Sequence, residues 1–182
     1  KATKSYSFFD IAEVLFDDKL DMALPYLSKD LRIDSVVPYH QFKQLEKLNF
    51  EETEIYKMLA NVNGSNVDTK CSKDKNFTVN VNSVSTSFKF EDKIKTKVKL
   101  EVSIAEFTCD FDLREPKGID KVESLANKQI KKEIEEVLKK IKDGKADLFG
   151  LNQIIYNKRH TLDKSFFEVE VETHINKKGL IY

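Results

Sequence analysis

The sequence predicts an α+β domain in which a bent, mainly antiparallel sheet carries helices packed largely on one face. Three observations lead to this prediction. Apolar side chains alternate through residues 77–113 and again through 167–175, which is the period of a half-buried strand. Over 119–142 they recur every three or four positions, which is the period of an amphipathic helix. The chain has 182 residues and no linker-like segment, so we expect residues 1–182 to form a single domain.

The N-terminal third predicts two helices with a strand between them. Residues 5–16 have one apolar side and predict a helix, and the Leu-Pro-Tyr-Leu segment at 24–27 interrupts that pattern. Residues 31–43 predict a strand, with Pro38 at an edge or a bend because proline cannot donate to a sheet. A second helix is expected to begin near Phe50, where acidic residues in the first turn suit the helix dipole.

The alternation in residues 77–113 changes phase twice. Apolar side chains move from odd to even positions near Asn82-Ser83, and back to odd positions near Ala105-Glu106. One extra residue in a strand moves every later side chain to the other face, so each change predicts a β-bulge. Asp92-Lys93 predicts a short hairpin turn. Long bent strands of this kind are expected to curl the sheet around the helices.

The segment 119–142 is the clearest helix of the chain. Pro116-Lys117-Gly118 precedes it and Asp143-Gly144 ends it. Its polar face suggests the i,i+4 ion pairs Glu135–Lys139 and Glu136–Lys140, worth about 0.2–0.5 kcal/mol each. A further helix is predicted from about Asp147 to Arg159, and a last strand over 167–175.

Two strands carry opposite charges on their polar faces. Lysines occupy positions 95, 97 and 99, and glutamates occupy 168, 170 and 172. If the strands pair, the charges form a cross-strand ladder. We favour a solvated sheet face without such an organised ladder, because exposed ion pairs are weak.

The two cysteines do not make a disulfide framework by themselves. Cys109 alternates with Phe107 and Phe111, which favours a small core residue. A Cys71–Cys109 disulfide is the less favoured alternative.

The sequence predicts no catalytic residue, no cofactor site and no metal site. None of His40, His160 and His174 has a second His or Cys at ligand spacing, and no phosphate-binding glycine loop occurs. The 31 basic and 31 acidic residues cancel, which gives no global attraction to nucleic acid. No apolar run approaches the roughly 20 residues of a membrane helix. The first residues, Lys-Ala-Thr-Lys, are typical of a cut fragment, so any targeting segment would lie upstream.

The segment 100–181 resembles a known family. The resemblance is carried by residues 100–107, 129–136, 146–151, 169–175 and 178–181, and by the Asp147-Leu148-Phe149-Gly150 element most of all. Together they resemble the C-terminal domain of the C subunit of nutrient germinant receptors of bacterial endospores, the Ger(x)C lipoprotein family. The chain departs from the family between His160 and Phe166, where it is short, and it contains no Trp.

The resemblance implies a non-catalytic subunit that acts through protein–protein interaction in spore germination. It implies membrane-embedded A and B subunits as partners, no nucleic acid, and no cofactor. It places the protein on the outer face of the inner spore membrane, held only by a lipid anchor upstream of this segment. Residues 1–182 are then the C-terminal domain of a longer lipoprotein.

Within this resemblance, Asp147, Phe149 and Gly150 are expected to form a structural motif. Gly150 allows either a backbone conformation closed to other residues or close packing. Phe149 is expected to fill the core between helix and sheet. The alternative function is a small-molecule or lipid-binding domain of an extracytoplasmic lipoprotein, suggested by the aromatic residues Phe77, Phe88, Phe90, Phe107 and Phe111.

Overall fold

A computed structural model of the chain describes residues 21–27, 29, 33–40, 43–143, 146–151 and 167–176. The predicted helix at 5–16 lies outside the described residues, as do residues 152–159 of the one predicted from about Asp147 to Arg159. Residues 147–150 form a turn, so that helix does not begin at Asp147. The elements in chain order are β1 (Met22–Leu27), β2 (Ile33–His40), β3 (Lys43–Gln44), α2 (Phe50–Leu59), β4 (Asn66–Lys70), β5 (Asn76–Phe90), β6 (Ile94–Phe107), α3 (Pro116–Asp143) and β7 (Phe167–Ile175).

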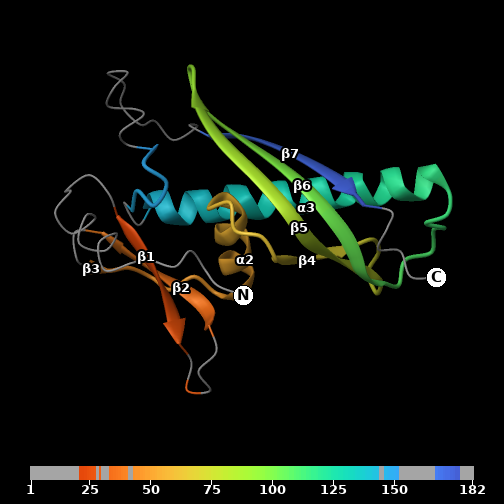
Figure 1. Ribbon diagram of the computed structural model, residues 1–182, viewed down its shortest axis with the longest axis horizontal. Coiled ribbons are helices and arrows are strands. Elements are labelled where there is room, and N and C mark those ends of the chain that lie inside the picture. Colours follow the sequence, from red (N-terminus) through yellow and green to blue (C-terminus); the bar gives the residue numbers. More distant parts are fainter. Residues whose placement is uncertain are drawn as a thin grey trace.

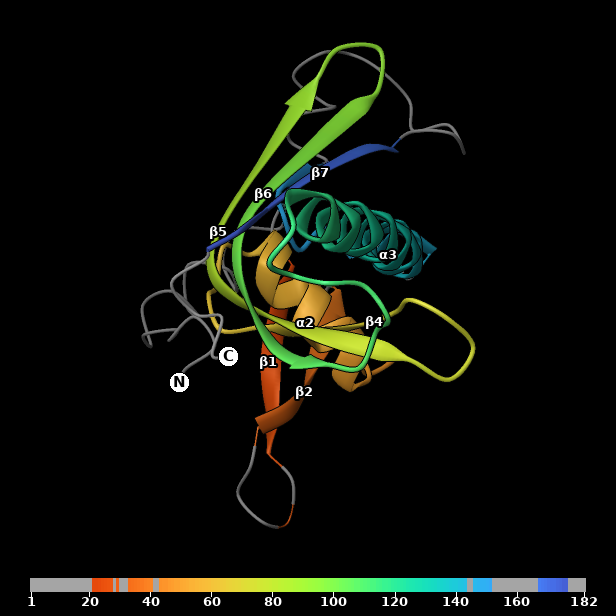
Figure 2. The same ribbon diagram turned by 90° about the vertical axis from the view of Figure 1, so that its right-hand side faces the viewer.

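The larger sheet has the strand order β4-β5-β6-β7 and curls around the helices. β4, β5 and β6 pair antiparallel, whereas β7 joins β6 in parallel. Figure 2, which looks along α3, shows the curved sheet with α3 and α2 on its concave side. α3 places its buried stripe there, through Val122, Ala126, Ile130, Ile134 and Val137. The predicted α+β class, with helices largely on one face of a mainly antiparallel sheet, is confirmed.

Both predicted bulges are present in the β5–β6 pair. The register shifts once between Val81 and Ser83, which leaves Asn82 unpaired, and once where Ala105 is passed over. Each extra residue bends its strand and increases the local twist. β6 ends at Phe107, so the alternation that continues to Leu113 does not extend the strand as predicted.

A disulfide joins Cys71 to Cys109, with 6.1 Å between the Cα atoms. The expectation that Cys109 is a plain core residue was therefore wrong. Lys70 at the end of β4 lies opposite Asn76, and Phe107 at the end of β6 lies opposite Phe77, so both cysteines follow strand ends that flank the start of β5. The alternation of apolar residues within one strand could not predict this disulfide, because the contact between the two cysteines depends on which strands are neighbours in the sheet.

The smaller sheet has the order β1-β2-β3, and its main part is the β1–β2 hairpin. The segment 24–27, predicted to be a break, is part of β1. Pro38 lies in the middle strand, not at an edge, and its carbonyl accepts a hydrogen bond from the Leu45 N–H. A residue's N and O project to the same side of a strand. The proline nitrogen therefore points toward Leu45 but cannot donate to it, and the pairing of β2 with β3 ends at Tyr39 and Gln44, one residue short of this position.

α2 begins and ends with recognisable signals. Asn49 caps it, since its side chain accepts from the Glu52 N–H while the Glu52 carboxylate accepts from the Asn49 N–H. This reciprocal arrangement satisfies two donors that the first turn leaves open. Beyond Leu59 the chain turns at Asn61, which has a φ of +58°. Ile55, Met58 and Leu59 then lie in the main core.

α3 is 28 residues long and starts at Pro116, where a proline costs no helix hydrogen bond. Its ion pairs differ from those predicted, since Glu135 and Glu136 face Lys131 and Lys132 of the preceding turn. Lys140 is thereby left for another partner. None of the helices in the described residues is both long and apolar enough to cross a membrane.

Candidate interaction surfaces

The described residues hold no cluster of metal-ligating side chains. No group of three His, Cys, Asp or Glu residues in this part of the chain could bind a metal ion. His40 bonds Asp21 through Nδ1 at 2.9 Å, and the exposed His174 lies 3.7 Å from Glu123. His160 is outside the described residues.

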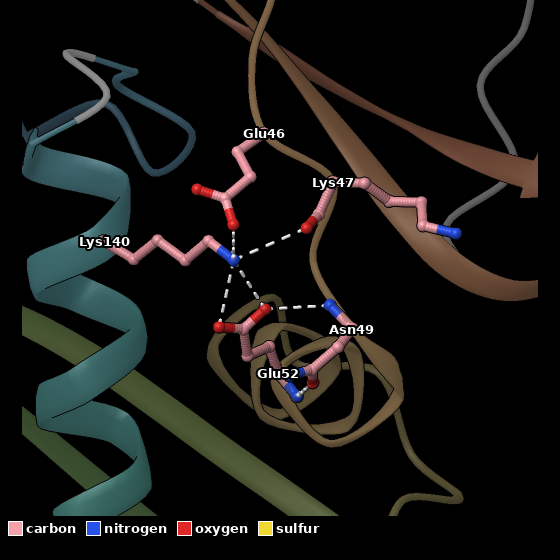
Figure 3. A network of polar contacts seen from close by, with 5 residues as sticks. All are labelled: Glu46, Lys47, Asn49, Glu52 and Lys140. Atoms are coloured by element: carbon pink, nitrogen blue, oxygen red, sulfur yellow. Dashed lines mark hydrogen bonds and ion pairs between the residues drawn. The ribbon is translucent and has the colours of Figure 1, made fainter.

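Lys140 is the centre of a polar junction between α3 and the segment leading into α2 (Figure 3). Its Nζ lies 3.1 Å from Glu46 Oε1 and 2.9 Å from Glu52 Oε2, and it donates to the Lys47 carbonyl at 3.4 Å. Glu52 also belongs to the capping box of α2. One ammonium group thus ties the C-terminal half of α3 to the start of α2. We call Glu46, Lys47, Glu52 and Lys140 the Lys140 junction.

The environment of Lys140 favours its charged form. Partial burial alone would lower the pKa of Lys140, but the hydrogen bonds to Glu52 and Glu46 and their negative charges outweigh that effect, and the pKa is raised. The sequence had suggested an i,i+4 pair between Glu136 and Lys140. Lys140 instead turns toward residues almost 90 positions earlier, which only the packing of α2 on α3 determines.

A groove of about 510 Å³ lies beside the Lys140 junction. Apolar side chains from β2 and the segment after β3, and from the end of α3 and just beyond it, line the groove, namely Pro38, Leu45, Leu48, Ile141 and Ala146. Charged groups surround them, including Glu46, Glu136 and Asp143. Neither the 31–48 region nor α3 forms this groove alone, so no local sequence signal could have predicted it.

The outer face of the larger sheet carries an ordered ladder of charges. In the β6–β7 register Lys95, Lys97 and Lys99 lie opposite Glu168, Glu170 and Glu172. Lys97 bonds Glu170 at 3.0 Å, and Lys99 lies 3.5 Å from Glu172. The ladder that we had ranked second therefore forms, on a face that is also solvent-exposed. Hydrogen bonding to Glu170, together with its charge, raises the pKa of Lys97. Lys95 departs from the ladder and pairs with Glu91.

The Asp147, Phe149 and Gly150 element lies where the two sheets and the helices meet. The Phe149 ring is stacked at 5.4 Å from Phe88 of β5 and lies 5.7 Å from Tyr56 of α2. Asp147 is buried, and its carboxylate accepts from the Leu151 N–H. Gly150 has a φ of +66°, in the left-handed region that glycine reaches without strain.

Phe149 also packs against three separate groups of buried side chains. It contacts the main core, the small cluster around Ile94 at the tip of the β5–β6 hairpin, and the cluster around Val36 in the smaller sheet. This one ring therefore connects parts of the chain that are far apart in sequence.

The comparisons with known proteins agree with this fold. The family model described as "Spore germination B3/GerAC like, C-terminal" matches residues 39–179. The chain belongs to this family. A curated relative, spore germination protein KC of Bacillus subtilis (strain 168), is 35% identical over 83 residues, which are 38% of this chain and 20% of the relative. The chain therefore spans only about a fifth of that relative's length.

A solved structure, described as the crystal structure of the GerBC protein, has the same fold. It superposes with a TM-score of 0.72 over 96% of this chain and 63% of its own, at 15% sequence identity. At this identity the likeness concerns the fold alone. The family match begins at the end of β2 and runs to beyond β7, so it includes the larger sheet, the Lys140 junction and the charge ladder.

Proposed function

We propose that this chain is the C-terminal domain of the C subunit of a nutrient germinant receptor and acts in spore germination through protein–protein contacts. The observation that carries the proposal is the match of the family model to residues 39–179. The relatives support it through their printed names, a spore germination protein and the GerBC protein. Membrane-embedded A and B subunits are the partners we propose, and catalysis has no part in the role.

We also propose a location on the outer face of the inner spore membrane. An upstream lipid anchor would hold the protein there as a lipoprotein, with this domain extending from the membrane. The charged outer face of the larger sheet suits such a location, because ordered ion pairs keep an exposed sheet soluble. The lining of the groove beside the Lys140 junction, apolar within a charged rim, is typical of a protein contact surface.

Deletion of residues 1–182 from the encoded protein tests the role. Spores that carry the deletion should lose their fall in optical density on exposure to nutrients, while a trigger that bypasses nutrient receptors should still germinate them. Normal nutrient germination in a strain without paralogous receptors would refute the proposal. Membrane fractionation of spores, with and without mutation of the lipidated residue, tests the location separately.

The alternative, a small-molecule or lipid-binding domain, has less support. The aromatic residues that suggested it mostly pack on one another. Phe77 is fully buried, and Phe107 contacts both Phe77 and Phe111. Calorimetric titration with candidate nutrients separates the two functions, since only the alternative requires binding heat.

We further propose that Asp147, Phe149 and Gly150 have a structural role and do not contact a ligand. The support is the burial of Asp147 and the position of the Phe149 ring among three buried clusters. Replacing Phe149 with Leu should lower thermal stability while leaving partner binding intact in the protein that remains folded.

A further inference from the structure

A second groove, of about 580 Å³, lies between the edge strand β4 and the middle of α3. Figure 1 shows β4 running below the central turns of α3, to the right of α2. β4 contributes Asp68, Thr69 and Lys70, and α3 contributes Gln129 and Lys132. The turn after β4 closes one end with Lys73, Asp74 and Lys75. This β4–α3 groove shares no residue with the groove beside the Lys140 junction.

The backbone of β4 offers unpaired hydrogen-bonding groups at its outer edge. Ser65 accepts from the Val81 N–H and Cys71 donates to the Lys75 carbonyl, so the odd-numbered residues turn toward β5. Asn66 points the other way and donates its N–H to Glu54 Oε2. Because the direction alternates along a strand, Asp68 and Lys70 direct their N–H and C=O groups away from β5. Within the described residues, no strand pairs with that edge.

Thr69 supplies a second, independent sign that the groove takes a polar occupant. Its side chain lines the groove and is only 2% exposed. Its hydroxyl makes no hydrogen bond with any described residue. Leaving a buried hydroxyl without a partner costs free energy that a polar ligand would recover.

The charge of the groove indicates the chemistry of that occupant. Four lysines and two aspartates line it. Lys75 pairs with Asp110 and Lys132 with Glu136, and Asp68 already accepts from the Thr78 hydroxyl. Lys70 and Lys73 have no ion pair with the part of the chain that the structure describes. An acidic partner would therefore meet unneutralised cations at the mouth of the groove.

We propose that the β4–α3 groove binds an extended, acidic segment of a partner polypeptide, which adds to β4 as a further strand. Its backbone would pair with Asp68 and Lys70, and alternate side chains would point toward Gln129 and Lys132 of α3. Main-chain hydrogen bonds provide affinity in this mode, and the flanking side chains select the sequence. The proposal does not rest on a role in germination, because any protein with such a segment could bind.

A synthetic peptide tests the proposal on the chain in solution. The probe is an acetylated heptapeptide of alternating Glu and Thr, and its control has Lys in place of every Glu. Binding is followed through the amide resonances of the protein. The acidic probe should shift the Asp68, Lys70 and Gln129 amides, and the basic control should not. Absence of these shifts, or equal binding of both peptides, would overturn the proposal.

One double variant and a pair of Asp68 variants separate the contribution of the charges from that of the backbone. The double change Lys73→Glu and Lys132→Glu should weaken binding about tenfold, near threefold for each reversed charge. Asp68→Pro removes an outward N–H without touching the pairing with β5, and should weaken binding by up to about tenfold. Asp68→Ala keeps that N–H and should bind at least as well as the original chain. Equal losses in both Asp68 variants would contradict strand addition.

N-methylated peptides provide the same test on the unaltered chain. Methylating alternate nitrogens blocks either the N–H groups that face β4 or those that face away. Only one of the two methylation patterns should abolish binding. If both patterns bind alike, the peptide does not add to the sheet edge.

Discussion

Removal of the Lys140 ammonium should destabilise the domain more than removal of any exposed lysine on α3. The side chains of Lys140 and Glu52 are 25% and 24% exposed, whereas Glu46 is 82% exposed. The contact to Glu46 is therefore a surface pair of low value, and Glu52 provides most of the coupling. Lys140→Met keeps the aliphatic stem in contact with its neighbours, and Glu52→Gln keeps an oxygen to accept from the Asn49 N–H.

The expected loss of unfolding free energy depends on which charges each substitution leaves without a partner. Exposed ion pairs stabilise proteins by up to about 1 kcal/mol, and we take that upper value for the partly buried pair of Lys140 and Glu52. Lys140→Met also leaves the partly buried Glu52 charge without its cation, so its total cost should be about 1.5–2 kcal/mol. For a chain of this length that corresponds to a fall in Tm of roughly 4–6 °C. The coupling energy from the double-mutant cycle should be about 1 kcal/mol.

Urea unfolding of the four proteins in the cycle measures these quantities. Lys139→Met is the matched control, because Lys139 is exposed and directly precedes Lys140 in α3. This substitution should lower the unfolding free energy by less than about 0.5 kcal/mol. A coupling energy below about 0.3 kcal/mol, or a control as costly as Lys140→Met, would refute the reasoning.

The raised pKa of Lys140 adds a test with a definite sign. A folded-state pKa above the unfolded value, near 10.4, gives stabilisation that is complete below that value. It is lost as the pH rises through the folded-state pKa. The difference in unfolding free energy between the original chain and Lys140→Met should stay constant from about pH 7 to pH 9 and shrink above about pH 10.4.

Three further predictions concern other parts of the molecule. Replacing Cys71 and Cys109 with Ser removes a disulfide between residues that are 38 positions apart in the sequence, so the unfolding free energy should fall by about 3–4 kcal/mol. An unchanged denaturation midpoint would contradict this prediction. Gly150→Ala places a Cβ at a φ of +66° and should cost about 1–2 kcal/mol in thermal unfolding, whereas a stabilising effect would show that the backbone can relax. Hydrogen bonds from the Arg114 side chain and N–H hold the pKa of Asp112 at about 2, so any stability that Asp112 contributes is present above its ordinary pKa near 4 and lost as pH falls through about 2. A carboxyl resonance of Asp112 that titrates near pH 4 would exclude this arrangement.

The sequence predicted the features that depend on local periodicity. The bulges at Asn82 and Ala105, the hairpin turn before Ile94 and the long α3 all follow from where apolar residues recur. Each of these features depends only on residues that are close together in the sequence. The same patterns hold no information on which strands become neighbours, and that is where the predictions were wrong or incomplete.

The disulfide and the Lys140 junction illustrate that limit. Cys71 and Cys109 meet because β4 and β6 both pair with β5, and Lys140 meets Glu52 because α2 packs on α3. Pro38 was expected at an edge or a bend because proline removes a donor, but it lies in the middle strand, where the pairing with β3 ends one residue short of it. Each miss has the same cause, a pairing that is decided by tertiary neighbours.

The curl of the larger sheet determines which elements lie next to α3, and therefore where the β4–α3 groove forms. The bulge residues Asn82 and Ala105 both lie in the β5–β6 pair, where they add twist to the centre of the sheet. A flat sheet would carry β4 away from α3, whereas the curled one brings α3 into contact with both β4 and β7. The bulges that the alternation predicted therefore contribute to the curl that places β4 beside α3, although the groove itself had no local signal.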